Sequence, residues 1–169
     1  KKPVQVGQVL FLLEVPEGLH DRPTGLLRGA APPPLIAINE HGVRLFVDVA
    51  HGQKTGFFLD QRDNRALASR LAKGCEVLNA FCYTGGFTVA ALAGAAKHGV
   101  SVDTSEEALA LGRRNVEANR LNPERAEWVA ADVFAYLRKL RDQGRRFGLI
   151  VLDPPKFAPT ERHVEKAAR

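Results

Sequence analysis

Four short apolar runs in this sequence each end in residues that could bind a small molecule. The stretch "NAFCYTGGF" begins at Asn79, single aspartates follow two later runs at Asp103 and Asp132, and "DPPKF" begins at Asp153. Glycine lets a ligand approach the backbone closely, and carboxylates accept hydrogen bonds from hydroxyl and amino groups. Signals of this kind at all four places favour one shared binding site over four unrelated turns.

The glycine-rich stretch follows the apolar run "EVLNA" and opens a run of small residues. A glycine turn between a strand and a helix is a usual place for a cofactor in open parallel sheets. The turn lacks the G-x-G-x-x-G spacing and the lysine of a P-loop, which disfavours dinucleotides and nucleoside triphosphates. On this stretch alone, an ordinary tight connection explains the residues equally well.

The two isolated aspartates suggest contacts to a nucleoside. Asp103 lies about 20 residues beyond the glycines, where a carboxylate can accept hydrogen bonds from ribose hydroxyls. We favour this role over a helix cap for Asp103 because Ser105 already suits the cap. Asp132 could accept a hydrogen bond from the amino group of an adenine. A role as the cap of the helix that begins at Val133 explains an aspartate at this position nearly as well.

The stretch "DPPKF" is the sharpest of the four signals. Two consecutive prolines after Asp153 predict a rigid, extended turn that presents the carboxylate and the following carbonyls to a planar polar group. The aromatic ring of Phe157 could stack on a base. A plain proline-rich loop is the alternative, but Asp-Pro-Pro at the end of a buried parallel strand is uncommon.

Alternating strand and helix patterns would position these residues. Buried strands are predicted at 76–80, 99–103, 126–130 and 147–153, with helices over 60–74 and 86–94, after Ser105, and from Val133. Strands separated by helices of this length form β-α-β units, and ligands bind beyond the carboxyl ends of their strands. The predicted fold class is therefore α/β, with a Rossmann-like parallel sheet.

The first part of the chain has a different texture. "LIAINEHGVRLFVDV" predicts a β-hairpin, and the prolines at 32–34 predict a stiff connector before it. We predict two domains, a β-hairpin-rich accessory region over residues 1–57 and the α/β domain over 58–169.

Composition argues against several classes of protein. There is no run of ~20 apolar residues and no leader, so we expect a cytoplasmic protein without a membrane partner. Two cysteines and five scattered histidines predict neither a disulfide framework nor a metal site. Between Arg138 and Arg169 nine basic residues face four acidic ones, which accounts for the whole net charge of +5 and suits nucleic acid. Because the chain begins at Lys1 and lacks methionine, we expect a fragment.

Five motifs in this order and spacing resemble one family: "HGQKTGFFLDQRDNR", "FCYTGGF", "VSVDTS", "DVF" and "VLDPPKF". They are similar to those of class I S-adenosylmethionine-dependent RNA methyltransferases that methylate C5 of cytosine in large-subunit ribosomal RNA. The resemblance, from about Val43 to Phe157, implies S-adenosylmethionine as cofactor and ribosomal RNA as partner, and leaves a homodimer open. Residues 58–169 would then be the N-terminal part of the methyltransferase domain, with its sheet incomplete.

The resemblance also assigns roles to residues of this sequence. Residues that would face the target base are Asp153, Pro154, Pro155 and Lys156. Residues that would contact the cofactor are Gln61, Arg62, Asn79, Phe81, Cys82, Tyr83, Thr84, Gly85, Gly86, Asp103, Thr104, Ser105, Asp132 and Val133.

One departure from the family concerns the nucleophile. Methylation at C5 of a pyrimidine requires a thiolate to add to C6 first. The family carries this cysteine in a loop after a later strand, beyond Phe157. Cys75 precedes the first strand, and Cys82 in the cofactor turn is more typical of a small buried side chain. We therefore expect residues 1–169 alone to be inactive.

Two other functions stay open at this point. One is an amino-methyltransferase, because Asp-Pro-Pro-aromatic turns also present exocyclic amines for direct methylation, although Lys156 separates the prolines from Phe157 here. The other is a non-catalytic RNA-binding module that keeps the fold and the basic segment. Cofactor binding would separate this module from both enzymes.

Overall fold

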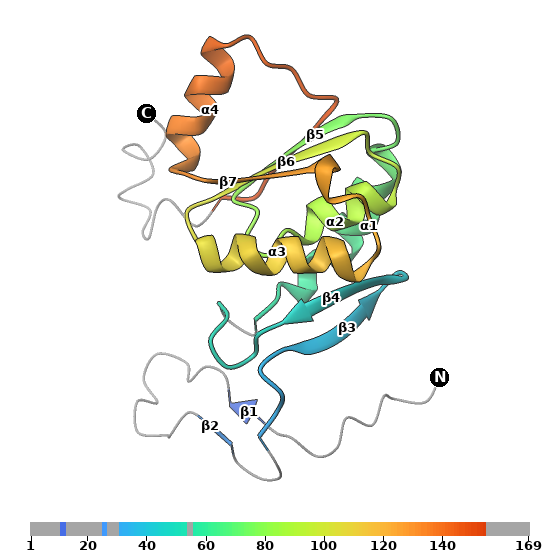
Figure 1. The fold of residues 1–169 in the computed structure, drawn as a ribbon, viewed down its shortest axis with the longest axis vertical. Helices are drawn as coiled ribbons and strands as arrows, with labels where there is room; N and C mark the ends of the chain where they lie inside the picture. Colours follow the sequence, from blue (N-terminus) through green and yellow to red (C-terminus); the bar gives the residue numbers. More distant parts are fainter. Residues whose placement is uncertain (1–10, 13–24, 27–30, 54–55, 155–169) are drawn as a thin grey trace. The chain divides into compact units, whose positions relative to one another are not determined.

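The computed structural model describes residues 11–12, 25–26, 31–53 and 56–154 (Figure 1). Pro155, Lys156 and Phe157 of the "DPPKF" motif lie outside the described residues. The chain divides into two compact units, residues 1–62 and 63–169. The assignment of residues 1–57 and 58–169 as domains stays a prediction.

The first unit contains the predicted hairpin. Strand β3 (Ile36–Glu40) pairs antiparallel with β4 (Val43–Val47), and Glu40 faces Val43 across the two-residue turn. Both turn residues have positive φ angles, 51° and 86°, which is the backbone geometry that matches the twist of a hairpin. Along β4, Leu45 and Val47 are buried, as expected for alternating faces. Strands β1 (Phe11–Leu12) and β2 (Gly25–Leu26) form a second short antiparallel pair.

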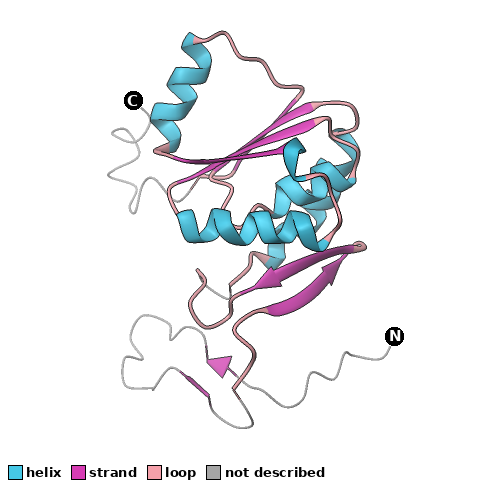
Figure 2. Ribbon diagram, viewed as in Figure 1, coloured by secondary structure: helices cyan, strands magenta, loops and turns pink. Residues whose placement is uncertain are grey.

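A parallel sheet of four strands lies at the centre of the second unit. Its strands are β5 (Glu76–Ala80), β6 (His98–Asp103), β7 (Ala126–Ala130) and β8 (Leu149–Leu152), in the order β7-β6-β5-β8. Figure 2 draws the strands in magenta. The predicted parallel α/β arrangement is confirmed. The last strand is shorter than predicted, because it begins at Leu149 rather than at residue 147. The carboxyl ends of all four strands lie at one edge, so the four signals of the sequence meet there.

Helices cover both faces of this sheet. They are α1 (Arg62–Leu71), α2 (Gly86–Ala93), α3 (Glu106–Ala118) and α4 (Val133–Asp142). Short 3-10 turns occur in each unit, η1 (Leu59–Gln61) in the first and η2 (Pro123–Arg125) in the second. Figure 1 shows α4 on one side of the sheet and α1, α2 and α3 on the other. Among the helices of the described ranges, none has both the length and the apolar character that crossing a membrane requires.

The two faces of the sheet differ in chemistry. On one face, alternate strand residues pack against Val133 and Leu140 of α4; these residues are Leu78, Ala80, Val100 and Val102. On the other face, the alternate positions of β5 and β6 bring Asn79 beside Ser101. Both of these polar side chains are buried and hydrogen-bonded to Thr88 of α2. The α4 face therefore stabilises the unit by apolar burial, and the α2 face carries polar contacts that are more dependent on geometry.

Candidate functional site

The glycine turn between β5 and α2 has an unusual backbone. The φ angles of Phe81, Tyr83 and Gly85 are 58°, 48° and 71°. Residues with a side chain rarely adopt positive φ, and such residues concentrate at binding sites where the surroundings hold them in place. The conformation of this turn therefore depends on contacts made to it by other parts of the fold.

Asp103 supplies one of these contacts. Its Oδ2 accepts a hydrogen bond from the backbone N–H of Tyr83 at 2.8 Å, and its Oδ1 accepts one from the N–H of Ser105 at 3.0 Å. The side chain thereby links the end of β6 to the turn after β5. Each carboxylate oxygen can accept more than one hydrogen bond, so Asp103 can hold the turn and still accept hydrogen bonds from ligand hydroxyls.

The residues after β6 and β7 cap helices. Ser105 Oγ accepts from the N–H of Ala108 at 3.2 Å, which confirms the predicted cap of α3. Asp132 Oδ1 accepts from the N–H of Ala135 at 2.7 Å and so caps α4, the alternative role that the sequence left open. Asp132 is exposed, and the cap uses one of its two oxygens, so contact with a ligand amine stays compatible with it.

An aromatic pair lies at the same edge of the sheet. The rings of Phe81 and Phe134 meet edge to face with centroids 5.5 Å apart, and 45% of Phe134 is exposed. The sequence analysis included Phe134 in the motif "DVF" but gave it no role at the site. An exposed aromatic side chain beside Asp132 offers an apolar surface of the kind that a flat base covers.

A buried polar network lies beneath the turn. Asn79 Nδ2 donates to Thr88 Oγ1 at 2.9 Å, and Thr88 Oγ1 lies 2.6 Å from Ser101 Oγ. The predicted contact of Asn79 with a cofactor stays a prediction. Its amide is buried and ties the first turn of α2 to β5. The sequence analysis did not assign Thr88 or Ser101 to the site. The signal that could have identified them is their polar character within elements that are otherwise apolar.

Arg65 was also missed by the sequence reasoning, although it lies in the quoted segment "DQRDNR". This α1 side chain is only 3% exposed, and its guanidinium lies 5.9 Å from the centroid of the Phe87 ring in the first turn of α2. A buried cation is costly unless its surroundings compensate for it. Its position beside the start of α2 places positive charge close to the glycine turn.

Cys82 lies in the turn and is buried. Burial raises the pKa of its thiol strongly, and the negative charge of Asp103 raises the pKa further. The thiol therefore stays protonated near neutral pH, which makes it a poor nucleophile. Cys75 stands at the other end of β5, about 16 Å from the turn at the rise of a β-strand.

The other predicted site residues are distributed as follows. Asp153 is exposed after β8, at the same edge as the turn, and Pro154 follows it. Gln61 ends η1 and Arg62 begins α1, and both fall in the first unit. The remaining predicted contacts of the second unit lie at this edge: Thr104 is exposed, whereas Thr84, Gly86 and Val133 are buried. Within the described ranges, no cluster of three potential metal ligands occurs.

Comparison with protein families finds one that matches most of the chain. The model of the S-adenosylmethionine-dependent methyltransferase family matches residues 22–165. The chain is 51% identical over 145 residues to Ribosomal RNA large subunit methyltransferase I of Escherichia coli O139:H28 and 50% identical to that of Erwinia tasmaniensis. Each match covers 86% of this chain, which spans only 37% of the length of the relative.

Solved structures with the same fold are also found. The structure of SMU.776 in complex with S-adenosylhomocysteine matches with a TM-score of 0.74 at 37% identity, over 82% of this chain and 37% of that one. A methyltransferase from Agrobacterium tumefaciens matches with a TM-score of 0.75 over 91% of this chain and 49% of that one. Its identity of 21% makes this second match evidence for the fold alone.

Proposed function

Because the chain belongs to the S-adenosylmethionine-dependent methyltransferase family, we propose that it is part of an enzyme that methylates C5 of a cytosine in large-subunit ribosomal RNA. The observation that carries the cofactor site is the hydrogen bond from Tyr83 N–H to Asp103, which joins the glycine turn to the end of β6. The similarity to the large-subunit methyltransferases supports ribosomal RNA as substrate. An enzyme acting on ribosomal RNA would work in the cytoplasm.

The residues at the carboxyl edge suit the three parts of S-adenosylmethionine. The backbone of residues 81–86 and the start of α2 suit the methionine carboxylate, because helix N-termini attract anions and Gly85 has no side chain to cap this one. Asp103 suits the ribose hydroxyls, and Asp132 with the exposed ring of Phe134 suits the adenine. The cofactor would supply a methyl group bound to a sulfonium.

The target base would meet the segment after β8. We propose that Asp153 holds the target cytosine through its N3 or N4 edge and that the prolines after it keep the carboxylate in place. Pro155 and Lys156, which were also predicted to face the base, lie outside the described residues. C5 becomes nucleophilic when a thiolate adds to C6. C5 would then take the methyl group as the bond from that methyl to the sulfonium sulfur breaks, with S-adenosylhomocysteine as the leaving group. The proton on C5 would pass to a base, and the thiolate would leave C6 as the C5–C6 double bond reforms.

Neither cysteine of the chain suits that addition. Burial and the charge of Asp103 keep Cys82 protonated, and Cys75 lies at the amino end of β5. We therefore propose that the nucleophile belongs to a part of the protein other than residues 1–169, and that these residues alone do not transfer methyl groups.

The basic segment from Arg138 onward would contact RNA phosphates. On α4, Arg138, Lys139 and Arg141 are exposed, and Arg146 follows the helix. Arg145 already makes contacts within the chain. Its Nη2 lies 3.4 Å from Oε2 of Glu76, and its guanidinium lies 5.3 Å from the centroid of the Phe147 ring. Contacts of this kind make RNA binding weaker as the salt concentration rises. A plot of the logarithm of the binding constant against the logarithm of the salt concentration should have a slope of about −0.7 per contacted phosphate on single strands.

Mapping the product tests the proposal. The gene product that contains this chain is incubated with labelled S-adenosylmethionine and unmodified ribosomal RNA, and the methylated nucleotide is identified by mass spectrometry. We expect 5-methylcytosine. A methyl group on an exocyclic amine would support the amino-methyltransferase instead, and RNA binding without cofactor binding would support a non-catalytic module.

A further inference from the structure

The glycine turn is supported from behind by helix α3. Asn115, in the middle of α3, has no exposed surface, and its Nδ2 donates a hydrogen bond to the carbonyl of Thr84 at 3.3 Å. Thr84 itself is 3% exposed. A side-chain amide buried this completely needs hydrogen-bond partners, because a buried polar group without one costs free energy.

This contact and a second one fix a single peptide plane. The carbonyl of Thr84 and the N–H of Gly85 belong to the same planar peptide and point in opposite directions. The carbonyl accepts from Asn115, and the N–H donates to the carbonyl of Cys82 at 2.8 Å. Rotation of this peptide would break both hydrogen bonds, so α3 determines the orientation of the turn at its centre.

The indole of Trp128, on β7, fills the space between the turn and α3. A Cβ atom at Gly85 or at Gly112 of α3 would overlap the six-membered part of this ring. The ring therefore lies against the backbone of both residues, and the turn cannot move toward α3 without displacing it. Trp128 is the single tryptophan of the chain.

We propose that Asn115 and Trp128 are positioning residues for the cofactor, which act through the peptide between Thr84 and Gly85. They hold the turn in its binding conformation before the ligand arrives, so that binding does not have to order it. This inference rests on the proposed cofactor site at the turn. It adds two residues of α3 and β7 that the resemblance did not assign to the site.

The test compares two asparagines on the same helix. Asn115→Leu removes the donor to the turn with little change in shape. Asn119→Leu is the matched control, because Asn119 caps the C-terminal end of α3 and its Nδ2 donates to the backbone carbonyl of Asn115 at 2.7 Å. We expect Asn115→Leu to weaken S-adenosylhomocysteine binding, measured by calorimetry, by about tenfold or more, and Asn119→Leu to leave it within about twofold. Equal affinities for the two variants would overturn the proposal.

The tryptophan gives a second readout that needs no mutation. When S-adenosylhomocysteine is titrated into the wild-type chain, the emission of Trp128 should change and saturate at the affinity found by calorimetry. Calorimetric binding with unchanged emission and unchanged acrylamide quenching would contradict the link between Trp128 and the turn, even if Asn115→Leu did not fold. Absence of any binding to the wild-type chain would instead contradict the proposed cofactor site, and with it this inference.

Discussion

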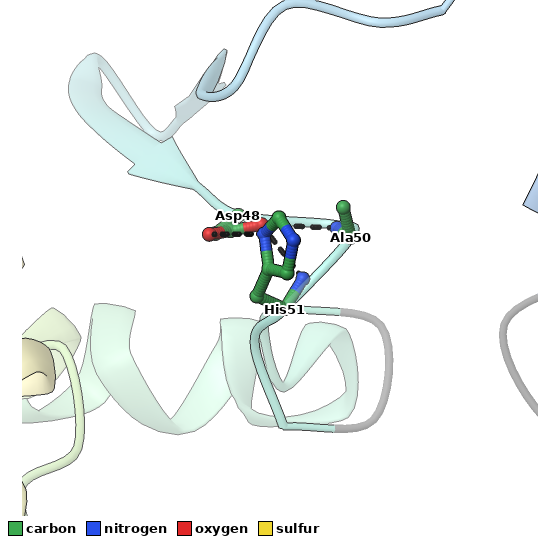
Figure 3. Close-up of polar contacts among 3 residues, drawn as sticks. All are labelled: Asp48, Ala50 and His51. Atoms are coloured by element: carbon green, nitrogen blue, oxygen red, sulfur yellow. Dashed lines mark hydrogen bonds and ion pairs between the residues drawn. The ribbon is translucent and has the colours of Figure 1, made fainter.

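Asp48 and Asp103 organise the backbone in the same way but over different distances along the chain. Asp48, just after β4, accepts hydrogen bonds from the N–H groups of Ala50 at 3.0 Å and His51 at 2.8 Å, and its Oδ2 lies 3.4 Å from His51 Nδ1 (Figure 3). Asp103 accepts one N–H two residues later and another from Tyr83, 20 residues earlier.

The difference shows what each carboxylate can control. Among the described residues, the hydrogen-bond partners of the Asp48 carboxylate lie within three residues of it, so this turn can form without the rest of the fold. The bond from Asp103 to Tyr83 exists only when β6 lies beside β5, because the two residues follow neighbouring strands. A change at Asp48 should therefore stay local, whereas a change at Asp103 should reach the candidate site.

The largest expected effect is on the free energy of unfolding, and it compares one glycine substitution in each unit. Gly85→Ala combines a positive φ with overlap of the new methyl group and Trp128, so we expect a loss of about 2–4 kcal/mol in the free energy of unfolding. Gly42→Ala in the hairpin also has positive φ, but nothing lies within 4 Å of the added methyl, and we expect about 1 kcal/mol. Urea denaturation followed by circular dichroism measures both. Equal losses would mean that Trp128 does not restrain the turn.

The comparison of the aspartates predicts the next effect. Asp103→Ala should weaken binding of S-adenosylhomocysteine about ten- to a hundredfold, because it removes a charged hydrogen-bonding group worth about 1.5–3 kcal/mol. Asp48→Ala is the control, since it removes an equivalent carboxylate from the first unit. Calorimetry on the two variants decides the matter, and a wild-type affinity for Asp103→Ala would remove this residue from the site.

The two cysteines extend the same contrast to reactivity. Within the described part of the chain, the hydrogen-bond partners of Cys75 Sγ are near neighbours in sequence, the carbonyls of Leu71 at 3.7 Å and Lys73 at 3.8 Å. The pKa of Cys82 is raised by burial and by Asp103. A thiol reagent at neutral pH should therefore label Cys75 at least about tenfold faster than Cys82.

Asp103 should influence the slower of these two reactions. Asp103→Asn removes one cause of the raised pKa of Cys82 and should speed its labelling, while the rate at Cys75 stays constant. Peptide mass spectrometry separates the two sites. Cys82 labelled as fast as Cys75 in the wild-type chain would show that the turn opens readily.

The smallest effect should come from the local turn. Partial burial raises the pKa of Asp48, but hydrogen bonds from the N–H groups of His51 and Ala50 and the contact with the His51 ring lower it more, so the net pKa lies below its ordinary value of 3.8. A lowered folded-state pKa means that this carboxylate stabilises the turn above that value, and that the stabilisation is lost as the pH falls through the folded-state pKa.

Amide chemical shifts measured by NMR during an acid titration test this directly. The N–H signals of Ala50 and His51 should move together below pH 3.8, with little change in the signals of residues 81–86 at that midpoint. A midpoint above that value would contradict the lowered pKa. A simultaneous movement of the glycine turn would show that the Asp48 turn is not local.

Much of the fold follows from patterns that neighbouring residues carry. Short apolar runs located β5, β6 and β7, and the start of α3 was predicted because Ser105 suits a helix cap. The hairpin with its turn at His41 and Gly42 was predicted from two apolar runs separated by a short polar stretch. These features depend on residues a few positions apart, so their physical cause is contained in a short piece of sequence.

The sequence also placed Asp103 and the glycine turn at one edge of a sheet, because parallel strands connected by helices bring their carboxyl ends together. It left open whether Asp132 caps a helix, which the structure shows that it does. It also gave no sign that the Asn79 amide donates to Thr88, and the contact of Asn79 with the ligand stays a prediction. The direction of each side chain depends on the strand register and on the helix that covers that face.

The contacts that hold the turn were decided by the tertiary structure alone. No local pattern relates Tyr83 to Asp103, Thr84 to Asn115, or Gly85 to Trp128. They become neighbours only because the sheet takes the order β7-β6-β5-β8, which places β6 between β5 and β7 and lets α3 pack behind the turn. Periodicity reports which face of an element is buried, but it carries no information on which element covers that face, and this choice set the conformation of the candidate site.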